Sequence, residues 1–304
     1  MSQFDFFQLD VFTDTPLTGN PLAVVPDASG LTDSQMQAVA REMNLSETSF
    51  VLESTVATKR VRFFTPTSEI PLAGHPSIGT WWLLAERGLI ELPQQGDLRV
   101  TQETLAGTLP VDLFIAGGRP ERVIMTQASP EFGEATDDTA TLGRVLGGST
   151  TTVRHDLLPQ VVSTGLPQLM IPISSLSELK SLPSGGAGSD LVAFLKKMGT
   201  DCAECFVIDS DEGNVVRTRM FAPGLGIPED PATGSAAGAL GAYLVWHGII
   251  RPSDGVASIS VLQGEEIDRP SRIEVEVAVG NGGEITEVRV GGTATTVVEG
   301  RVTI

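Results

Sequence analysis

The sequence has few basic residues, few cysteines and few aromatic side chains. It contains 20 Lys and Arg against 38 Asp and Glu, which gives a formal net charge of −18 at pH 7. A surface of this sign repels phosphate backbones and anionic lipid, and no cluster of Lys or Arg overrides that repulsion locally. Nucleic acid and membrane are therefore not expected as partners.

The scarcity of cysteine argues against a disulfide framework or a zinc cluster. Cys202 and Cys205 form one C-x-x-C pair without a second pair, and only His75, His155 and His247 could complete a metal shell. Half of a zinc site or a redox pair remains an alternative at this point. Reduced thiols at the start of the strand CFVID are the preferred interpretation, and no metal or cofactor is expected.

No segment has the pattern of an export signal or a membrane anchor. The N-terminal MSQFDFFQLDVF carries acidic residues where a signal peptide carries basic ones. The apolar run 232–250 approaches the length of a transmembrane helix, but it is rich in Ala and Gly and contains Thr233, Ser235 and His247. We expect this run to form a helix buried in a cytoplasmic globular protein, because a helix that is apolar on all sides is also typical of a protein interior.

An internal repeat is present and predicts the architecture. Residues 50–66 and 206–223 share an apolar strand, a polar turn, a second strand with Arg62 or Arg219, and the pattern Phe-x-Pro. Each copy leads to a glycine-marked helix start and then to two further strands with alternating polarity, which is typical of antiparallel sheet. The pattern predicts an α+β fold of two similar lobes, each a curved, barrel-like antiparallel sheet wrapped around a central helix. Arg62 and Arg219 are expected to be structural partners of carboxylates.

The boundary between the lobes is expected at residues 116–121, where Gly-Gly and Pro interrupt the strands. The N-terminal lobe would span residues 1–118 and the C-terminal lobe residues 119–304, and the last strand near 294–304 could return to the first lobe. Two amphipathic helices, LTDSQMQAVAREMN and SDLVAFLKKMG, are expected outside the sheets. The first has an N-cap signal at Thr32 or Asp33.

The starts of the two central helices carry candidate binding residues. Backbone N–H groups and the positive end of the helix dipole bind carboxylates and other anions. Gly74 and Gly234 would let a ligand approach the backbone closely, and Thr233 and Ser235 would supply hydroxyl donors. Duplicated halves tend to pack with their equivalent ends together, so we expect both helix starts to face one cleft.

Three titratable residues accompany these helix starts. Glu47 directly precedes the first strand of the repeat, His75 lies at the first helix start, and Asp230 precedes the second. Glu47 and His75 are candidate acid/base groups, with Asp230 as a partner or a binding residue. Each residue also has a structural interpretation, namely a solvated Glu, a helix-capping His and a turn Asp.

These motifs resemble those of the PhzF family, phenazine-biosynthesis-like isomerases related in fold to diaminopimelate epimerase. The resemblance covers essentially the whole chain and rests on FFQLDVFTDTPLTGNPLAVV, NLSETSFVL, RFFTPTSEIPLAGHPSIGT, VSTGLPQLMIPI and EDPATGSAAGALGAYL. It implies two lobes with the active site between them, a homodimer, and a small-molecule carboxylate as substrate. It also implies a cofactor-independent isomerase in which Glu47 moves a proton between carbons of a small cyclic amino- or hydroxy-carboxylate. In the family's namesake the substrate is a dihydro-hydroxyanthranilate.

The resemblance assigns roles to individual residues. The expected catalytic residues are Glu47, His75 and Asp230, and the expected substrate-binding residues are Gly74, Gly234, Ser235, Thr233 and Asn20. The epimerase relatives use two facing thiols at these helix starts, whereas this chain has His75 and Ser235 there, which disfavours a two-thiol racemase. An epimerase or racemase that uses Glu47 and His75 as opposed bases, and a non-catalytic carboxylate-binding protein, remain alternatives.

Overall fold

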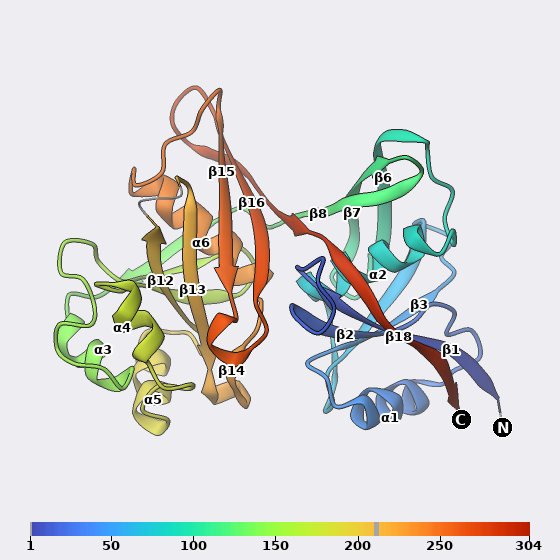
Figure 1. Ribbon diagram of the computed structural model, residues 1–304, viewed down its shortest axis with the longest axis horizontal. Coiled ribbons are helices and arrows are strands. Elements are labelled where there is room, and N and C mark those ends of the chain that lie inside the picture. The colour runs from blue at the N-terminus through green and yellow to red at the C-terminus, as the bar shows by residue number, and fades with distance from the viewer. Residues whose placement is uncertain (1, 210–212) are drawn as a thin grey trace. The chain divides into compact units, whose positions relative to one another are not determined.

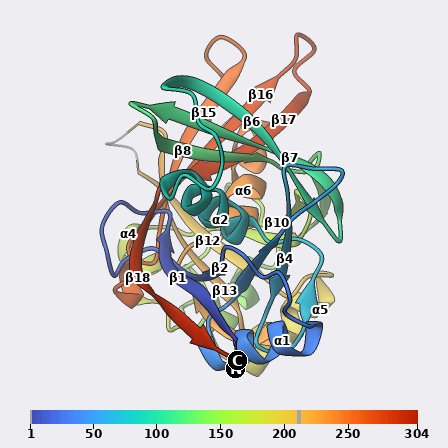
Figure 2. The same ribbon diagram turned by 90° about the vertical axis from the view of Figure 1, so that its right-hand side faces the viewer.

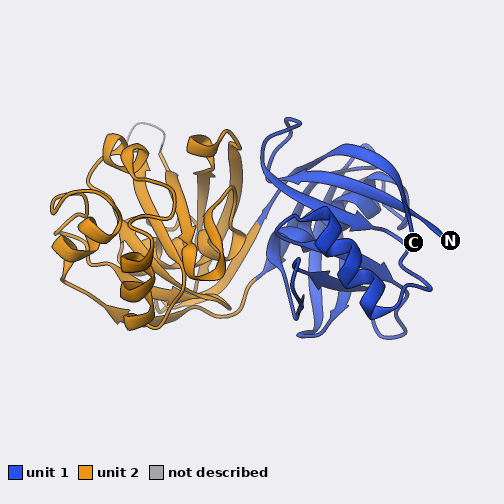
Figure 3. Ribbon diagram, turned by 90° about the horizontal axis from the view of Figure 1, so that it is seen from below, with its two compact units in different colours: residues 1–126, 291–304 blue, residues 127–290 orange. Residues whose placement is uncertain are grey.

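A computed structural model describes residues 2–209 and 213–304 of the chain. The chain divides into two compact units, which Figure 3 colours separately: unit 1 contains Met1–Thr126 and Gly291–Ile304, and unit 2 contains Gln127–Val290. About 22% of the residues are helical and 43% are in strands. This mixed composition confirms the expectation that helices and sheet together build the fold.

Unit 1 contains the first ten elements of the chain and its last strand. These are β1 (Gln3–Val11), β2 (Asn20–Val25), α1 (Asp33–Met43), β3 (Thr48–Leu52), β4 (Lys59–Phe64), β5 (Glu69–Ile70), α2 (Gly74–Glu86), β6 (Gln95–Thr104), β7 (Gly107–Ala116), β8 (Arg119–Thr126) and β18 (Ala294–Thr303). Strand β1 is antiparallel to β18 and β2, and β2 is parallel to β3. Strand β4 is antiparallel to β3 and β5 and parallel to β6. The sheet continues with two antiparallel pairs, β6–β7 and β7–β8.

Helix α2 is almost entirely buried in unit 1. It contacts strands β1, β2, β3, β7, β8 and β18, and Figures 1 and 2 show it among these strands. Gly79 permits the close approach, because a Cβ atom at this position would lie 2.6 Å from Leu22 and 2.7 Å from Val11. An apolar helix without a polar face is stable here because strands cover it on several sides.

Helix α1 is amphipathic, as predicted, and packs on the outer face of the strands. Its Met36 and Val39 cluster with Phe50 and Phe64 from β3 and β4. Thr32 is the N-cap and forms a capping box with Gln35, which confirms one of the two predicted cap positions.

Unit 2 contains the remaining elements. These are β9 (Glu131–Ala135), α3 (Thr139–Val145), β10 (Gln160–Ser163), β11 (Pro167–Pro172), α4 (Leu176–Ser181), α5 (Ser189–Lys197), β12 (Ala203–Asp209), β13 (Val215–Ala222), η1 (Pro223–Leu225), β14 (Ile227–Asp230), α6 (Gly234–Trp246), β15 (Val256–Gln263), η2 (Glu265–Ile267), β16 (Ser271–Val279) and β17 (Ile285–Gly292), the last two residues of which belong to unit 1. Part of the predicted polar turn between β12 and β13, residues 210–212, lies outside the described residues.

The strand pairings of unit 2 follow the same order as those of unit 1. Strand β11 is antiparallel to β10 and parallel to β12. Strand β13 is antiparallel to β12 and β14 and parallel to β15, and β15 is antiparallel to β16. Each of these pairings has a counterpart in unit 1, from β1–β2 through β6–β7.

Helix α6 is the buried helix that the apolar run predicts. It contacts β10, β11, β15 and β16, and the ring of its Tyr243 lies 5.7 Å from that of Phe206 in an edge-to-face arrangement. Helices α3, α4 and α5 lie together in Figure 1 and cover the opposite face of β11–β13, where Leu191 and Leu195 pack with Cys205 and Phe221. Within the described residues no helix is both long and apolar enough to cross a membrane.

The boundary between the units differs from the expected one. Gly117 and Gly118, at the expected boundary, both have positive φ and form the hairpin turn between β7 and β8. The chain leaves unit 1 only after β8, at Thr126, and it returns at Gly291. Glycines and a proline mark a tight hairpin as readily as a domain linker, and the sequence pattern does not separate the two.

Candidate functional site

The start of α2 presents backbone N–H groups that no side chain caps. The N-cap residue Ala73 is extended, with φ −140° and ψ 134°, and no side chain among the described residues caps the helix. A Cβ atom built on Gly74 would meet nothing within 4 Å, so there is open space beside the first turn. Uncapped N–H groups and the positive end of the helix dipole together favour an anion at this place.

Glu47 and His75 lie side by side in unit 1. Glu47 Oε2 is 3.6 Å from His75 Nε2, although the two residues come from different segments, one before β3 and one in the first turn of α2. The His75 side chain is only 9% exposed and that of Glu47 20% exposed. Burial lowers the pKa of His75 to about 3, so the imidazole is neutral at physiological pH.

The hydrogen bonds of His75 fix its tautomer. The ring donates to the backbone carbonyl of Pro21, and Nε2 has no hydrogen-bond partner among the described residues, so Nδ1 is the donor. The neutral ring therefore presents the lone pair of Nε2 to Glu47. A protonated Glu47 could donate to this lone pair, whereas an ionised Glu47 would face it acceptor to acceptor. The Glu47–His75 pair is therefore suited to holding a proton transiently on the Glu47 carboxyl group.

Asn20 is linked to this pair through its chain neighbour Pro21, which contacts His75. It is fully buried at the first position of β2, directly before the Pro21 whose carbonyl orients His75. On the other side, Ser77 Oγ donates to Ala73 O at 2.8 Å, and Gln102 Nε2 donates to Ser77 Oγ at 3.0 Å. These contacts fix the beginning of α2, and therefore His75, against β6.

In unit 2 the start of α6 is organised around Asp230. Thr233, the N-cap residue, does not cap the helix with its hydroxyl but donates it to Asp230 Oδ2 in a short hydrogen bond. Gln263 from β15 donates through Nε2 to Asp230 O at 2.7 Å and accepts from Thr233 N at 3.1 Å. Asp230 is 9% exposed. The loop between β14 and α6 is thus held by hydrogen bonds rather than left as a solvated turn.

Ser235 and Gly234 are held by side chains from neighbouring strands. Gln168 on β11 donates through Nε2 to Ser235 Oγ at 2.9 Å, and Gln127 donates to Gly234 O at 3.0 Å. Gly238 makes room for Gln127, because a Cβ atom at that glycine would lie 2.0 Å from Gln127 Oε1. In the first turn of α6, the Ser235 hydroxyl and the Gly234 carbonyl are therefore held in fixed orientations.

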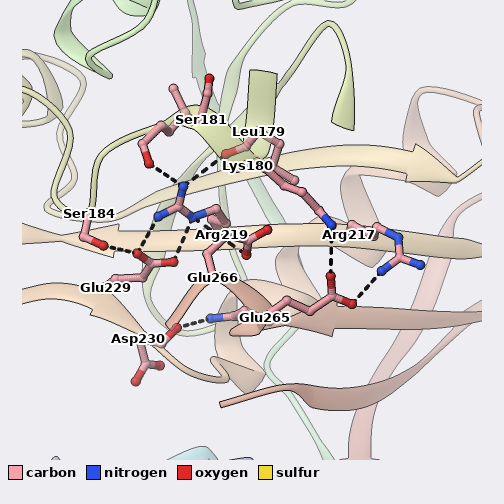
Figure 4. A network of polar contacts seen from close by, with 12 residues as sticks. Leu179, Lys180, Ser181, Ser184, Arg217, Arg219, Glu229, Asp230, Glu265 and Glu266 are labelled. Carbon is pink, nitrogen blue, oxygen red and sulfur yellow. Dashed lines mark hydrogen bonds and ion pairs between the residues drawn. The ribbon is translucent and has the colours of Figure 1, made fainter. Parts of the chain in front are cut away.

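A buried ion pair fixes the strand that carries Asp230 (Figure 4). Arg219 donates to both carboxyl oxygens of Glu229, at 2.8 and 2.7 Å, and to the carbonyls of Leu179 and Leu182. Both charged side chains are only 3% exposed. Arg62 makes the same two-pronged contact with Glu69 in unit 1, at 2.7 and 2.7 Å. Both arginines are structural partners of carboxylates, as expected.

The two cysteines do not act together. Both are buried free thiols, and they point into different clusters: Cys202 packs with Met220 and Ala236, and Cys205 packs on the side of α5. Burial raises the pKa of Cys202 to about 12, which keeps it an unreactive thiol. The packing supports the structural interpretation of the C-x-x-C pair.

Comparison with known proteins identifies the family to which the chain belongs. A sequence profile of the phenazine biosynthesis-like protein family matches residues 9–300. The chain belongs to the PhzF family. It is 39% identical to an uncharacterized isomerase of Clostridium acetobutylicum, over 97% of this chain and 96% of that protein.

Other PhzF relatives show the same full-length similarity. The trans-2,3-dihydro-3-hydroxyanthranilate isomerase of Pseudomonas aeruginosa is 36% identical over 96% of this chain and 97% of its own length. The crystal structure of a PhzF-family phenazine biosynthesis protein from Bacillus anthracis superposes with a TM-score of 0.90 at 32% identity, over 100% of both chains. These relatives confirm the expectation that the chain is an isomerase.

Sequence reasoning named the residues of this PhzF-family chain that lie at the two helix starts but missed those that hold them. Glu47 lies beside His75 in unit 1, which also contains Gly74 and Asn20, and Asp230, Thr233, Gly234 and Ser235 lie at the start of α6 in unit 2. Gln168, Gln263 and the buried Glu204 were not singled out. The available signal was a polar residue on the core-facing side of an otherwise apolar strand, as in SVLQ and ECFVI.

Proposed function

We propose that the chain is a cofactor-independent isomerase that moves a proton between two carbons of a small cyclic amino- or hydroxy-carboxylate. The observation that carries the proposal is the Glu47 carboxyl group 3.6 Å from Nε2 of a buried, neutral His75. The name of the Pseudomonas aeruginosa relative supports the substrate class, because that protein isomerises a dihydro-hydroxyanthranilate.

In the proposed reaction Glu47 carries the proton. Its carboxylate removes a proton from a ring carbon, and the electron pair of the C–H bond moves into the neighbouring π system. The protonated Glu47 then donates a hydrogen bond to Nε2 of His75, which holds the proton between the two steps. Delivery of this proton to a second carbon, with electrons returning from the π system, completes the isomerisation without a change in oxidation state.

The remaining residues are assigned to substrate binding. The N–H groups at Gly74 in unit 1, and those at Gly234 in unit 2, are each suited to a carboxylate, since anions bind at helix N-termini. Asn20, Thr233 and Ser235 would bind further polar groups of the substrate, and Asp230 would assist proton transfer.

The strand pairings that correspond between the two units, and the Arg–Glu contact that each unit contains, support the inference that the units arose by duplication around α2 and α6. We infer that each of these helices is the central helix of its lobe. A homodimer and a cytoplasmic location remain predictions from the family resemblance and from composition.

The test replaces Glu47 by Gln and compares it with Glu42→Gln, a change at an exposed position of α1. Loss of a general acid/base typically costs about 10²–10⁴-fold in rate. We expect this loss in kcat for the Glu47 variant, with ligand binding retained, and no change for the Glu42 variant. Turnover of the Glu47→Gln protein at the wild-type rate would remove Glu47 from the mechanism.

The non-catalytic alternative is tested with the same proteins. Thermal-shift screening against cyclic amino and hydroxy acids reports binding, because a ligand at about 100 times its Kd adds about 2.7 kcal/mol to stability. A carboxylate-binding protein would show a shift for a ligand whose carbon-bound hydrogens never exchange with solvent. An isomerase shows the shift together with that exchange.

A further inference from the structure

Gln263 makes three hydrogen bonds at the start of α6. It is the last residue of β15 and is only 1% exposed. Its Oε1 accepts from Thr233 N at 3.1 Å, and its Nε2 donates to Asp230 O at 2.7 Å and to Thr233 Oγ1 at 3.1 Å. One buried side chain therefore contacts both residues that the proposed function places here.

These contacts fix the orientation of the Gln263 amide. A backbone N–H can only donate and a backbone carbonyl can only accept, so the amide oxygen must face Thr233 N and the amide nitrogen must face Asp230 O. The alternative orientation, with oxygen and nitrogen exchanged, would break both bonds.

The orientation of the amide then sets the direction of the next hydrogen bond. Thr233 Oγ1 accepts a hydrogen from Gln263 Nε2 and donates its own hydroxyl proton to its other neighbour, Asp230 Oδ2. Oδ2 is thus an acceptor in this arrangement. A proton on Oδ2 would require the Thr233 hydroxyl to turn away and give up its bond to the carboxylate.

Unit 1 has a glutamine at the corresponding place, and it has different contacts. Gln102 on β6 is fully buried, donates to Ser77 Oγ and accepts from Trp81 Nε1, each at 3.0 Å. Ser77 and Trp81 are residues of the α2 interior rather than members of the proposed site. Gln102 fixes the start of α2 in unit 1 and is therefore a matched control for effects on the Asp230 carboxyl group.

We propose that Gln263 is a positioning residue that acts through Thr233: it orients the Thr233 hydroxyl and thereby fixes Asp230 Oδ2 as an acceptor. The role in catalysis rests on the proposed function, whereas the effect on the carboxyl group does not. Without Gln263 the Thr233 hydroxyl can turn away, and the carboxylate loses a hydrogen bond that favours its ionised form.

The experiment follows the Asp230 carboxyl carbon by NMR in protein labelled with ¹³C at the Asp side-chain carboxyl, with Asp230→Asn to assign the signal. The variants are Gln263→Met, which keeps the length of the side chain, and the control Gln102→Met. A hydrogen bond worth about 0.5–1.5 kcal/mol corresponds to about half to one pH unit. We expect the Asp230 titration to move to higher pH by this amount in Gln263→Met and to stay unchanged in Gln102→Met.

A second variant keeps the proposal testable if Gln263→Met does not fold. Thr233→Val removes the hydroxyl but leaves Gln263 in place, and it should move the Asp230 titration in the same direction, whereas Thr233→Ser should not. An Asp230 titration that does not move in Gln263→Met would overturn the proposal. If only Thr233→Val folds, an unmoved Asp230 titration in that variant would overturn it. An equal shift in Gln102→Met would overturn it too.

The same variants separate this proposal from the proposed function. Full activity of Asp230→Asn would remove Asp230 from the reaction, and the titration shift would still establish the effect of Gln263. If Asp230 is needed, we expect the acid limb of the kcat/KM pH profile to move with the NMR titration in Gln263→Met.

Discussion

Glu204 is a buried acid whose effect on stability can be calculated and tested. It lies on β12 and is fully buried. Burial is the main cause that raises its pKa to about 8 from the model-peptide value of 4.5; the charge of Asp230 adds to the shift and the Thr218 hydroxyl opposes it. The folded protein therefore holds a proton at pH values where the unfolded chain has released it.

The sign of the pH dependence follows from proton linkage. Below about pH 4.5 Glu204 is protonated in both states, and its contribution to stability is fully present. Between pH 4.5 and 8 the unfolded chain loses the proton while the folded protein keeps it, so the free energy of unfolding falls as pH rises. Because one unit of pKa corresponds to about 1.4 kcal/mol, the full loss is at most about 5 kcal/mol and is reached above pH 8.

The perturbation is Glu204→Gln, which keeps the shape of the side chain and removes the titration. Urea unfolding at pH 5, 7 and 8.5, followed by circular dichroism, gives the free energy of unfolding of both proteins. The difference between variant and wild type isolates Glu204, because all other titrating groups are shared. We expect this difference to move in favour of the variant by several kcal/mol from pH 5 to pH 8.5.

The control is Glu131→Gln, which removes a carboxyl group at an exposed position of β9 that folding does not bury. A pH-independent difference between Glu204→Gln and wild type would show that Glu204 is ionised in the folded protein. That result would refute the assignment of a neutral buried acid on β12.

Two further predictions concern stability. Burial lowers the pKa of His75, so the contribution of its neutral ring to the free energy of unfolding is present above pH 6.5 and is lost as pH falls toward 3. His75→Gln should therefore flatten the fall in unfolding free energy between pH 6.5 and pH 4. An unchanged slope would contradict a buried neutral imidazole. Breaking a buried ion pair from one side costs about 3–5 kcal/mol, so Arg219→Met should lower the unfolding free energy by this amount. Arg62→Met should lower it by less, because the side chains of Arg62 and its partner Glu69 are 12% and 22% exposed. Equal losses in the two arginine variants would indicate that burial of the pair does not set its value.

The helix starts could be predicted from the sequence because local signals define them. A proline-containing loop followed by glycine and an apolar run places the first residues of α2 and α6 at Gly74 and Gly234, as the structure has them. The arginines of the repeat, Arg62 and Arg219, were expected to be partners of carboxylates, and the partners prove to be near in the chain, 7 and 10 positions away.

The contacts that hold the site could not be predicted, because they join residues far apart in the chain. Gln263 contacts Asp230 across 33 positions, and Gln168 contacts Ser235 across 67. A glutamine or a glutamate in a strand carries no sign of what its side chain meets across the sheet. The tautomer of His75 depends likewise on the Pro21 carbonyl, which only the folded chain brings to the ring.

The central claim is that Glu47 carries a proton from one carbon to another, and deuterium labelling tests it most directly. Trans-2,3-dihydro-3-hydroxyanthranilate, the substrate named for a relative, is incubated in D₂O with wild type, Glu47→Gln or Glu42→Gln and followed by NMR. The account predicts movement of the double bond with solvent deuterium or transferred hydrogen at the new carbon, for wild type and Glu42→Gln but not for Glu47→Gln. Deuterium at a single carbon without movement of the double bond would indicate an epimerase, and an unimpaired Glu47→Gln protein would contradict the claim.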